Sequence, residues 1–151
     1  MFPNLDLESI AEQINNEVTQ ENSTEIGRVF LMQFNGNKAT VIMENGKPKE
    51  ATTKEKVQMY TQMLLRTKLD KYKVYKNEDF GMTYFNYMGM RNLPQNFINI
   101  EFKRELEEKL KQLNIVDSIT NFSANKQGSV LYVEFTINLI NGESIEISEV
   151  I

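Results

Sequence analysis

The chain contains neither cysteine nor histidine. Without cysteine it has no disulfide framework and no thiolate zinc site. Without histidine it lacks imidazole metal ligands, Ser-His-Asp and Cys-His nucleophile systems, and the usual general base near neutral pH. The chain is therefore expected to fold by packing alone, and its 151 residues suit one domain with its own core. We predict no cofactor and no metal site.

Basic charge, long apolar runs and nucleotide-binding glycine motifs are also missing. The net charge of −4 disfavours a surface that tracks phosphate groups. No apolar run approaches the roughly 18 residues that span a bilayer, and the opening "MFPNLDLESIAEQ" has no secretory-signal pattern. The 7 glycines stand singly, without G-x-G-x-x-G or P-loop spacing. We therefore expect neither nucleic acid nor a membrane among the partners.

Residues 1–25 are predicted to form a short helix followed by a linker. Over 6–18, apolar side chains recur at spacings of three and four after Asp6, a plausible N-cap. These side chains are Leu7, Ile10, Ile14 and Val18. Residues 19–25 are polar and featureless. A helix this short is marginal alone in water, so we expect its apolar side to dock on a partner chain, with its own domain as the alternative.

The remaining residues, 26–151, alternate between strand and helix patterns. Paired strands are predicted near both ends of this stretch, and two longer helical patterns lie between them. This order predicts an α+β fold in a single domain. We expect a mostly antiparallel sheet with N-terminal and C-terminal hairpins and two main helices packed on it.

The N-terminal hairpin is predicted over 28–44. Asn35-Gly36 suits its tight turn, and Asn45-Gly46 ends the second strand in the same way. Both dipeptides favour the positive φ angles that two-residue turns require.

A helix is predicted after the capping box that Thr52 and Glu55 form in the sequence. Its buried positions are predicted to be Val57, Tyr60, Met63 and Leu64. Beyond this helix, residues 72–75 predict a short strand. Residues 82–88 predict one or two helical turns, closed by Gly89.

The second main helix is predicted over 95–112. Its apolar face is formed by Phe102, Leu106, Leu110 and Leu113. The opposite face is predicted to be solvated, with Glu105–Lys109 and Glu107–Lys111 as ion pairs four residues apart.

Three strands are predicted at the end of the chain, over 115–122, 129–140 and 143–151. The middle strand alternates apolar residues onto one face, which are Leu131, Val133, Phe135, Ile137 and Leu139. Asn141-Gly142 makes the tight turn between the last two strands.

Residues 72–89 concentrate the aromatic side chains. The chain has only 6 Tyr and 9 Phe, and this stretch holds Tyr72, Tyr75, Phe80, Tyr84, Phe85 and Tyr87. Such a run is compatible with a stacking surface for bases or sugars, with a glycosidase cleft, or with a packed core that docks on other proteins. In an acidic chain, core and interface positions are the favoured interpretation.

Glu78 and Asp79 are the carboxylates beside these aromatics. A glycosidase needs two carboxylates facing each other across the sugar, with the pKa of one of them raised. Adjacent residues of an extended chain point to opposite sides, so this pair cannot act as that couple. Nothing in the sequence identifies a second carboxylate, and we predict no enzymatic activity.

Several short motifs follow one another in a characteristic order. The chain opens with "MFPNLDL", has a hairpin with a glycine turn, ends its first main helix with "LLRT", and carries "MG" after the aromatic run and "IVDSITNF" before the last strands. The positions that complete the motifs are Thr67, Tyr72, Val74, Tyr75, Phe80, Gly81 and Gly89. Over most of its length the chain resembles the small wedge proteins of contractile phage tails. The likeness is greatest to the PBSX-type baseplate family, which is related to the T-even wedge protein historically labelled lysozyme-like.

One departure from this family concerns its charged contact. The family carries an acidic residue followed by arginine just after the threonine, whereas this chain reads "TKLDKY" from Thr67. Lys68 or Lys71 would supply a point charge there, but not the planar fork of arginine.

The resemblance implies a structural role rather than catalysis. It implies a baseplate wedge component of a contractile tail, in a phage or a phage-tail-like bacteriocin, on which the first sheath ring assembles by strand addition. The implied partners are other wedge proteins and the sheath protein, with the tail tube or hub as further candidates, in multiple copies within a symmetric particle. The implied location is the virion baseplate, assembled in the bacterial host cytoplasm. The alternative is a lysozyme-like tail enzyme that degrades peptidoglycan.

The last predicted strand is the leading candidate for the sheath-facing edge. Its candidate residues are Ile145, Glu146, Ile147 and Glu149. Isoleucines and polar residues alternate in it, so we expect one buried and one wet face, with the two glutamates discouraging self-pairing. The hairpin over 28–44 is the competing edge.

Overall fold

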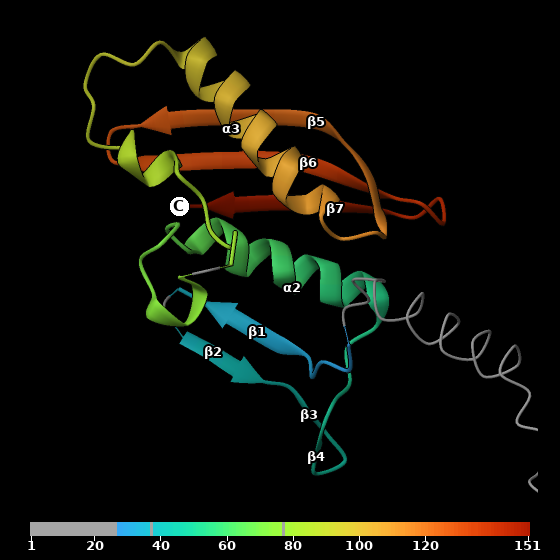
Figure 1. Ribbon diagram of the computed structural model, residues 1–151. Coiled ribbons are helices and arrows are strands. Elements are labelled where there is room, and N and C mark those ends of the chain that lie inside the picture. Colours follow the sequence, from blue (N-terminus) through green and yellow to red (C-terminus); the bar gives the residue numbers. More distant parts are fainter. Residues whose placement is uncertain (1–26, 37, 77) are drawn as a thin grey trace, which may run out of the picture.

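The structure is a computed structural model that describes residues 27–36, 38–76 and 78–151. The predicted helix over 6–18 and its linker lie outside the described residues. The described residues adopt the predicted α+β fold, with two α-helices and three small antiparallel sheets. Figure 1 shows helix α3 over the C-terminal sheet and helix α2 between that sheet and the N-terminal hairpin.

The C-terminal sheet has the order β5-β6-β7, with β5 at Val116–Gln127, β6 at Val130–Leu139 and β7 at Ser144–Val150. The predicted alternation of β6 is confirmed, because all five of its predicted core residues are buried. Strand β5 continues five residues past the predicted end. Gln127 pairs with Val130 across a two-residue turn at which Gly128 has a φ of 62°.

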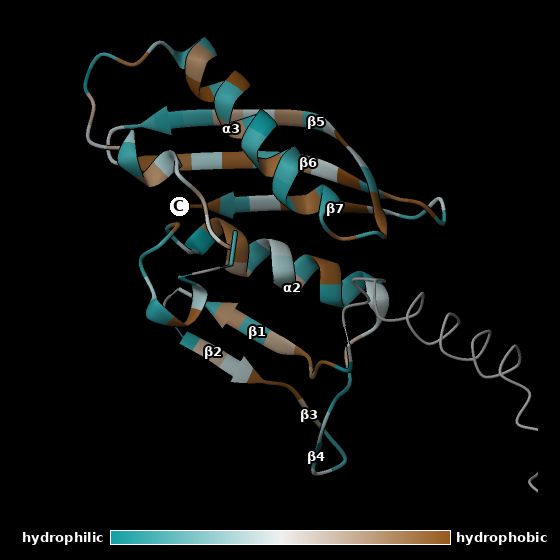
Figure 2. Ribbon diagram, viewed as in Figure 1, coloured by the Kyte–Doolittle hydropathy of each residue, from teal (hydrophilic) through white to brown (hydrophobic). Residues whose placement is uncertain are grey.

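Helix α3, Gln95–Lys111, packs on β5 and covers one face of this sheet. The predicted apolar face is confirmed, since its four members are all buried in the main core; they are Phe102, Leu106, Leu110 and Leu113. Figure 2 shows hydrophobic and hydrophilic residues alternating along α3, as expected for a helix with one covered side.

Helix α2, Thr53–Arg66, begins with the predicted capping box between Thr52 and Glu55. The predicted stripe covers only part of its buried surface: Tyr60 and Met63 are half-buried, whereas Met59, Thr61 and Leu65 are buried. The helix has two covered sides. Leu64 and Leu65 belong to the main core, while the Met59 sulfur accepts a hydrogen bond from the Met32 N–H, 3.1 Å away in the N-terminal hairpin.

The N-terminal region forms two short hairpins rather than one long one. Strands β1, Met32–Asn35, and β2, Lys38–Val41, pair first; β3, Met43–Glu44, and β4, Lys47–Pro48, pair next. The predicted second strand is interrupted at Ile42, whose N–H donates to Leu31 and whose carbonyl accepts from Lys49, both at 2.9 Å. The predicted turn at Asn45-Gly46 is confirmed by φ angles of 51° and 74°.

The segment that links the two helices contains 3₁₀ turns. The predicted strand over 72–75 is wrong: Lys73–Tyr75 form a 3₁₀ turn, η1, and Val74 is 76% exposed. No strand in the described part of the chain lies alongside this stretch to pair with it. A second 3₁₀ turn, η2, at Tyr84–Asn86 confirms the predicted helical turn.

Strand-like pairing occurs a few residues earlier than predicted, between Lys68 and Met82. The Met82 N–H donates to Thr67 at 2.8 Å, and the Leu69 N–H donates to Met82 at 3.1 Å. Gly81 makes this approach possible. Its φ is +121°, and a Cβ atom there would lie 2.8 Å from the Leu69 nitrogen.

Replacing Gly81 should therefore strongly destabilise the fold. We expect Gly81→Ala to lower the free energy of unfolding by about 3 kcal/mol or more, because it adds backbone strain and a clash with backbone atoms. The matched control is Gly89→Ala, where a Cβ would meet nothing within 4 Å. This control should change the free energy by less than about 0.5 kcal/mol. Urea unfolding measures both, and equal effects would contradict the role assigned to Gly81.

Candidate functional site

The aromatic segment is largely a packed part of the core. Phe80 packs against Tyr60 and Tyr75, with ring centroids 5.4 Å and 4.9 Å away. Tyr84 is buried between Phe85 and Phe102, and its hydroxyl donates to the Leu65 carbonyl at 3.0 Å. The remaining aromatic members, Tyr72 and Tyr87, are exposed. Because most of these rings face one another, they do not form a continuous stacking surface.

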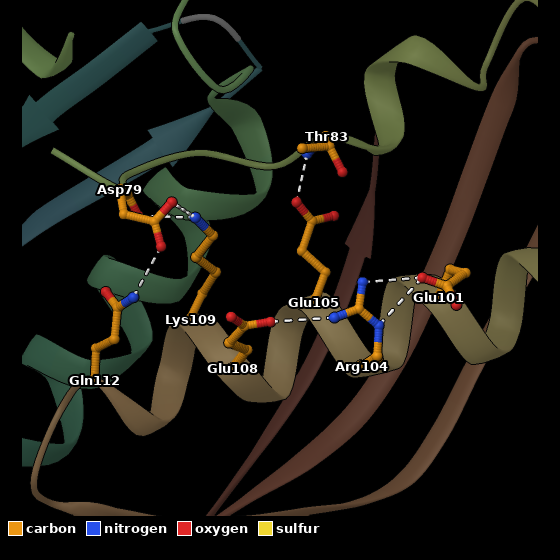
Figure 3. A network of polar contacts seen from close by, with 8 residues as sticks. All are labelled: Asp79, Thr83, Glu101, Arg104, Glu105, Glu108, Lys109 and Gln112. Atoms are coloured by element: carbon orange, nitrogen blue, oxygen red, sulfur yellow. Dashed lines mark hydrogen bonds and ion pairs between the residues drawn. The ribbon is translucent and has the colours of Figure 1, made fainter. Parts of the chain in front are cut away.

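Polar side chains of α3 and of its C-cap residue hold this segment in place (Figure 3). We call them the α3 clamp; they are Glu105, Lys109 and Gln112. The Thr83 N–H donates to Glu105 at 2.7 Å. Lys109 donates to the Asp79 carboxylate and, at 3.0 Å, to the Asp79 carbonyl. Gln112 donates to the same carboxylate at 3.1 Å.

The α3 clamp corrects the prediction of a solvated Glu105–Lys109 pair. Glu105 and Lys109 are only 9% and 5% exposed. Their spacing of four residues places them on one side of the helix, and this side faces the segment that carries Asp79. The solvent face of α3 instead carries Arg104, which bonds Glu101 and Glu108 at 3.0 Å and 3.2 Å. Exposed pairs of this kind contribute little to stability.

The electrostatics of Asp79 do not fit a catalytic acid. The hydrogen bond from Lys109 lowers the pKa of Asp79 below its ordinary value of 3.8. A glycosidase acid requires a raised pKa instead. Among the described residues, no group of three or more acidic side chains could hold a metal ion.

Strand β7 has one bonded edge and one free edge. Leu131 and Ile151 exchange backbone hydrogen bonds of 2.9 Å in both directions. Because bonded and non-bonded pairs alternate in an antiparallel ladder, the odd-numbered residues of β7 bond to β6. The even-numbered residues direct their N–H and C=O groups to the other edge, which we call the β7 edge. No strand in the described part of the chain pairs with it.

The four candidate edge residues therefore divide into two groups. Ile145 and Ile147 are buried in the core, and their backbone groups face β6. Glu146 has an exposed side chain and faces the β7 edge with its backbone. Glu149, which we expected to be an exposed charge, accepts hydrogen bonds from Gln62 at 2.7 Å and from Arg66 at 3.0 Å.

Arg66 is a linking residue that the sequence analysis did not single out. Besides Glu149, it donates to the Gly36 carbonyl at 3.0 Å, and its guanidinium lies 5.4 Å from the centre of the Phe34 ring. It thereby joins α2 to both β7 and the N-terminal hairpin. Its place as the basic residue of "LLRT" was the available signal, because a basic residue in the last helical turn can reach neighbouring carbonyls.

Comparison of the sequence with known protein families identifies the family of this chain. The model of the family described as "contractile injection system sheath initiator" matches residues 30–142. The chain belongs to this family. The match includes both helices, the aromatic segment, β5 and β6. No curated protein matches the chain.

As a member of the sheath initiator family, the chain is a structural component of a contractile injection system. It is part of the tail or baseplate structure and associates with other baseplate and sheath components. None of the helices in the described residues is long and apolar enough to cross a membrane.

The α3 clamp should make the stability of this sheath initiator dependent on Asp79. Asp79→Ala leaves the Lys109 ammonium with only a carbonyl partner, so we expect a loss of about 1 kcal/mol at neutral pH. The carboxylate is 59% exposed, which keeps the effect small. Lys109→Met removes the charge that needs a partner, so adding Asp79→Ala to it should cost much less.

The same contact predicts a pH dependence. Because the pKa of Asp79 is lowered in the folded state, its contribution is complete above the ordinary value of 3.8 and is lost as the pH falls through the lower folded-state value. Urea unfolding of the four proteins at neutral and acidic pH measures both effects. An unchanged difference between wild type and Asp79→Ala in acid would contradict the assignment.

Proposed function

We propose that this protein is a baseplate wedge component on which the first sheath ring of a contractile phage tail or related bacteriocin assembles. A strand of the sheath protein adds to the β7 edge. The observation that carries this proposal is the regularity of β7, which pairs with β6 without interruption from Ser144 to Val150. A row of unpaired backbone groups beside such a strand is a template for strand addition.

The other edges of the structure fit this role less well. Strand β5 has register shifts between Val116 and Ser118 and between Thr120 and Ser123. Bulges of this kind protect an edge against pairing. In the competing N-terminal hairpin, β1 and β2 are only 4 residues long each, whereas β7 has 7. Among the described edge strands, β7 therefore has the longest regular row of backbone groups that no strand pairs with.

The side chains along the β7 edge disfavour pairing between identical copies but permit pairing with a strand of another protein. Ser144, Glu146 and Ser148 are exposed and lie on the polar face of the sheet. A charge on an edge strand discourages pairing between identical copies. A partner strand still gains affinity from the main-chain hydrogen bonds, with little demand on side-chain identity.

The test removes one backbone donor from the β7 edge. Ser148→Pro deletes an outward N–H, whereas Ser148→Ala keeps it, and proline is tolerated on edge strands. We expect Ser148→Pro to fold but to nucleate little or no full-length sheath in assembled tails, and Ser148→Ala to behave as wild type. Circular dichroism checks folding and electron microscopy counts sheathed tails.

Val41→Pro tests the competing edge in the same assay. The Ile42 N–H bonds to Leu31, so the alternation of bonded pairs turns the Val41 N–H outward. If folded Ser148→Pro still forms full-length sheath while Val41→Pro does not, the sheath strand adds to the hairpin and the β7 assignment is wrong.

We further propose how this protein is placed in the tail particle. The protein is present in multiple copies in a symmetric baseplate, contacts other wedge proteins and the tail tube or hub, and is assembled in the bacterial host cytoplasm. Residues 1–25 form an arm that docks on another chain, and residues 26–151 form the wedge domain. Membership of the sheath initiator family supports the repeated copies, because a platform for a sheath ring needs symmetric repetition of its subunits.

We propose a structural role without hydrolysis of peptidoglycan. We expect no clearing of a peptidoglycan suspension and no release of sugars by the purified protein, because the lowered pKa of Asp79 does not suit the general acid that glycoside cleavage requires. Clearing that disappears in Asp79→Asn or Glu78→Gln would favour the lysozyme-like alternative.

A further inference from the structure

A groove lies at the C-terminal end of α2. The β1–β2 turn, the segment after α2 and the last residues of the chain line it, and Figure 1 shows the turn and the C-terminus at this same end of the helix. Its aromatic lining is Phe34, Tyr72 and Phe85, and its basic lining is Lys38, Arg66 and Lys71. We call it the basic groove.

The basic groove combines apolar surface with unneutralised positive charge. No described aspartate or glutamate lines it. Arg66 pairs with Glu149, whereas neither Lys38 nor Lys71 forms an ion pair with any described residue. Tyr72, in the same lining, is 47% exposed. Such a surface fits a segment that is both acidic and apolar.

The end of strand β7 also lies in this groove. Val150 and Ile151 line it, and Val150 is 60% exposed. Because Ile151 bonds to Leu131, the preceding Val150 directs its N–H and C=O groups to the β7 edge. A segment bound in the basic groove therefore covers this exposed apolar residue. It also obstructs one end of the row of backbone groups to which a strand would add.

The first residues of the same chain are acidic and apolar. Residues 1–26 contain six acidic side chains and no lysine or arginine; the acidic residues are Asp6, Glu8, Glu12, Glu17, Glu21 and Glu25. Of the 21 acidic and 17 basic residues of the protein, the rest of the chain then holds 15 acidic and 17 basic ones. The negative net charge therefore resides entirely in residues 1–26, which also carry the predicted apolar helix side with Leu7 and Ile14.

The predicted helix over 6–18, which we call the arm helix, is within reach of the basic groove of its own chain. Residues 28–30 lie beside the segment before α2, since the Ala51 N–H donates to Val29 at 2.8 Å and Arg28 pairs with Glu50 at 2.9 Å. The groove is at the opposite end of α2, whose 14 residues span about 21 Å. The linker over 19–26 spans about 26–29 Å when extended. The linker alone therefore covers this distance.

We propose that, before assembly, the arm helix binds the basic groove of its own chain and obstructs the β7 edge. This inference rests on the proposed strand addition at the β7 edge, and it names a regulator of that site. The apolar side of the arm helix covers Tyr72 and Val150, and its carboxylates pair with Lys38 and Lys71. The contact weakens as salt rises, because its charged part is exposed.

A contact of this kind is reversible. A short flexible tether gives an effective concentration on the order of millimolar, so a weak contact within one chain keeps the groove occupied. A baseplate chain that binds the arm helix more tightly removes it from the groove. Docking of the arm on another chain, as proposed above, then exposes the β7 edge, and sheath assembly begins only where a baseplate is present.

Disulfide formation within the full chain tests the contact, because the natural sequence has no cysteine that could interfere. Ala11→Cys places a thiol on the apolar side of the arm helix, and Ala39→Cys places one in the lining of the groove. The doubly substituted protein is oxidised at several concentrations, and mass spectrometry locates the disulfide. A disulfide within one chain forms at a rate independent of protein concentration, whereas one between chains forms faster as the concentration rises.

The expected result is a rapid disulfide within the chain. It should form at least about tenfold faster than in the same protein with Lys38→Glu and Lys71→Glu, a difference of about 1.4 kcal/mol. Adding Glu8→Lys and Glu17→Lys to the arm of the slow protein should restore part of the rate. The matched control carries Lys47→Glu and Lys111→Glu instead, which change the net charge equally at exposed lysines outside the groove, and it should react as fast as the parent.

The same disulfide tests the regulation. Oxidised Ala11→Cys/Ala39→Cys protein is immobilised and exposed to purified sheath protein of the same tail. We expect it to retain little or no sheath protein, and reduction of the disulfide should restore retention. Glu8→Lys with Glu17→Lys in the otherwise natural chain leaves the groove intact but releases the arm, so this variant should retain more sheath protein than wild type.

Three outcomes would overturn this inference. Equal disulfide rates with and without Lys38→Glu and Lys71→Glu would show that the arm does not bind the groove. Disulfides formed only between chains would show that the arm binds another copy. Equal retention by the oxidised and reduced proteins, with none by Ser148→Pro, would show that strand addition occurs without regulation by the arm. The first two outcomes involve no sheath protein, so failure of the arm contact is distinguishable from failure of the β7 assignment.

Discussion

The contact between Lys109 and Asp79 connects α3 to the segment that runs between the two helices. Through it, and through the bond from Thr83 to Glu105, α3 holds the segment that crosses back to α2. Met82 in this segment bonds to both Thr67 and Leu69 at the end of α2. The α3 clamp therefore ties together the two helices. The N-terminal hairpin is joined to α2 by separate contacts, from the Met32 N–H to Met59 and from Arg66 to the Gly36 carbonyl.

Burying charged groups in this way is tolerated because each one has a partner. Among the described residues, no buried side-chain nitrogen or oxygen lacks a hydrogen bond. The Lys109 side chain is only 6% exposed, but the Asp79 carboxylate beside it is 59% exposed, so water moderates the cost of leaving either charge without its partner. The α3 clamp stabilises the fold only while the segment that carries Asp79 stays in place. Gly81 contributes to this placement, because it allows the segment to approach Leu69.

The helices and strands that bury only one face were predicted correctly from the sequence. The alternation in β6 and the apolar side of α3 arise from one buried face each, so periodicity located both, down to residues such as Val133 and Leu106. The two covered sides of α2 were missed because a period describes one face. Glu105 and Lys109 were assigned to solvent because a spacing of four residues is the same for an exposed pair and for a clamp. Residues 72–75 have strand-like side chains, but strands also need a neighbour to pair with.

Strand β7 was predicted from the sequence, but the contacts that hold it in place, on which its proposed role depends, are tertiary. A strand at the end of a chain tends to fray. Here Glu149 is bonded to Gln62 and Arg66 of α2, and Ile151 exchanges two hydrogen bonds with Leu131. Arg66 in turn bonds to Gly36, so the edge strand is held from the hairpin side as well. Because β7 is already ordered, the proposed strand addition requires no further ordering of this strand, and preorganisation of this kind increases affinity without any new contact.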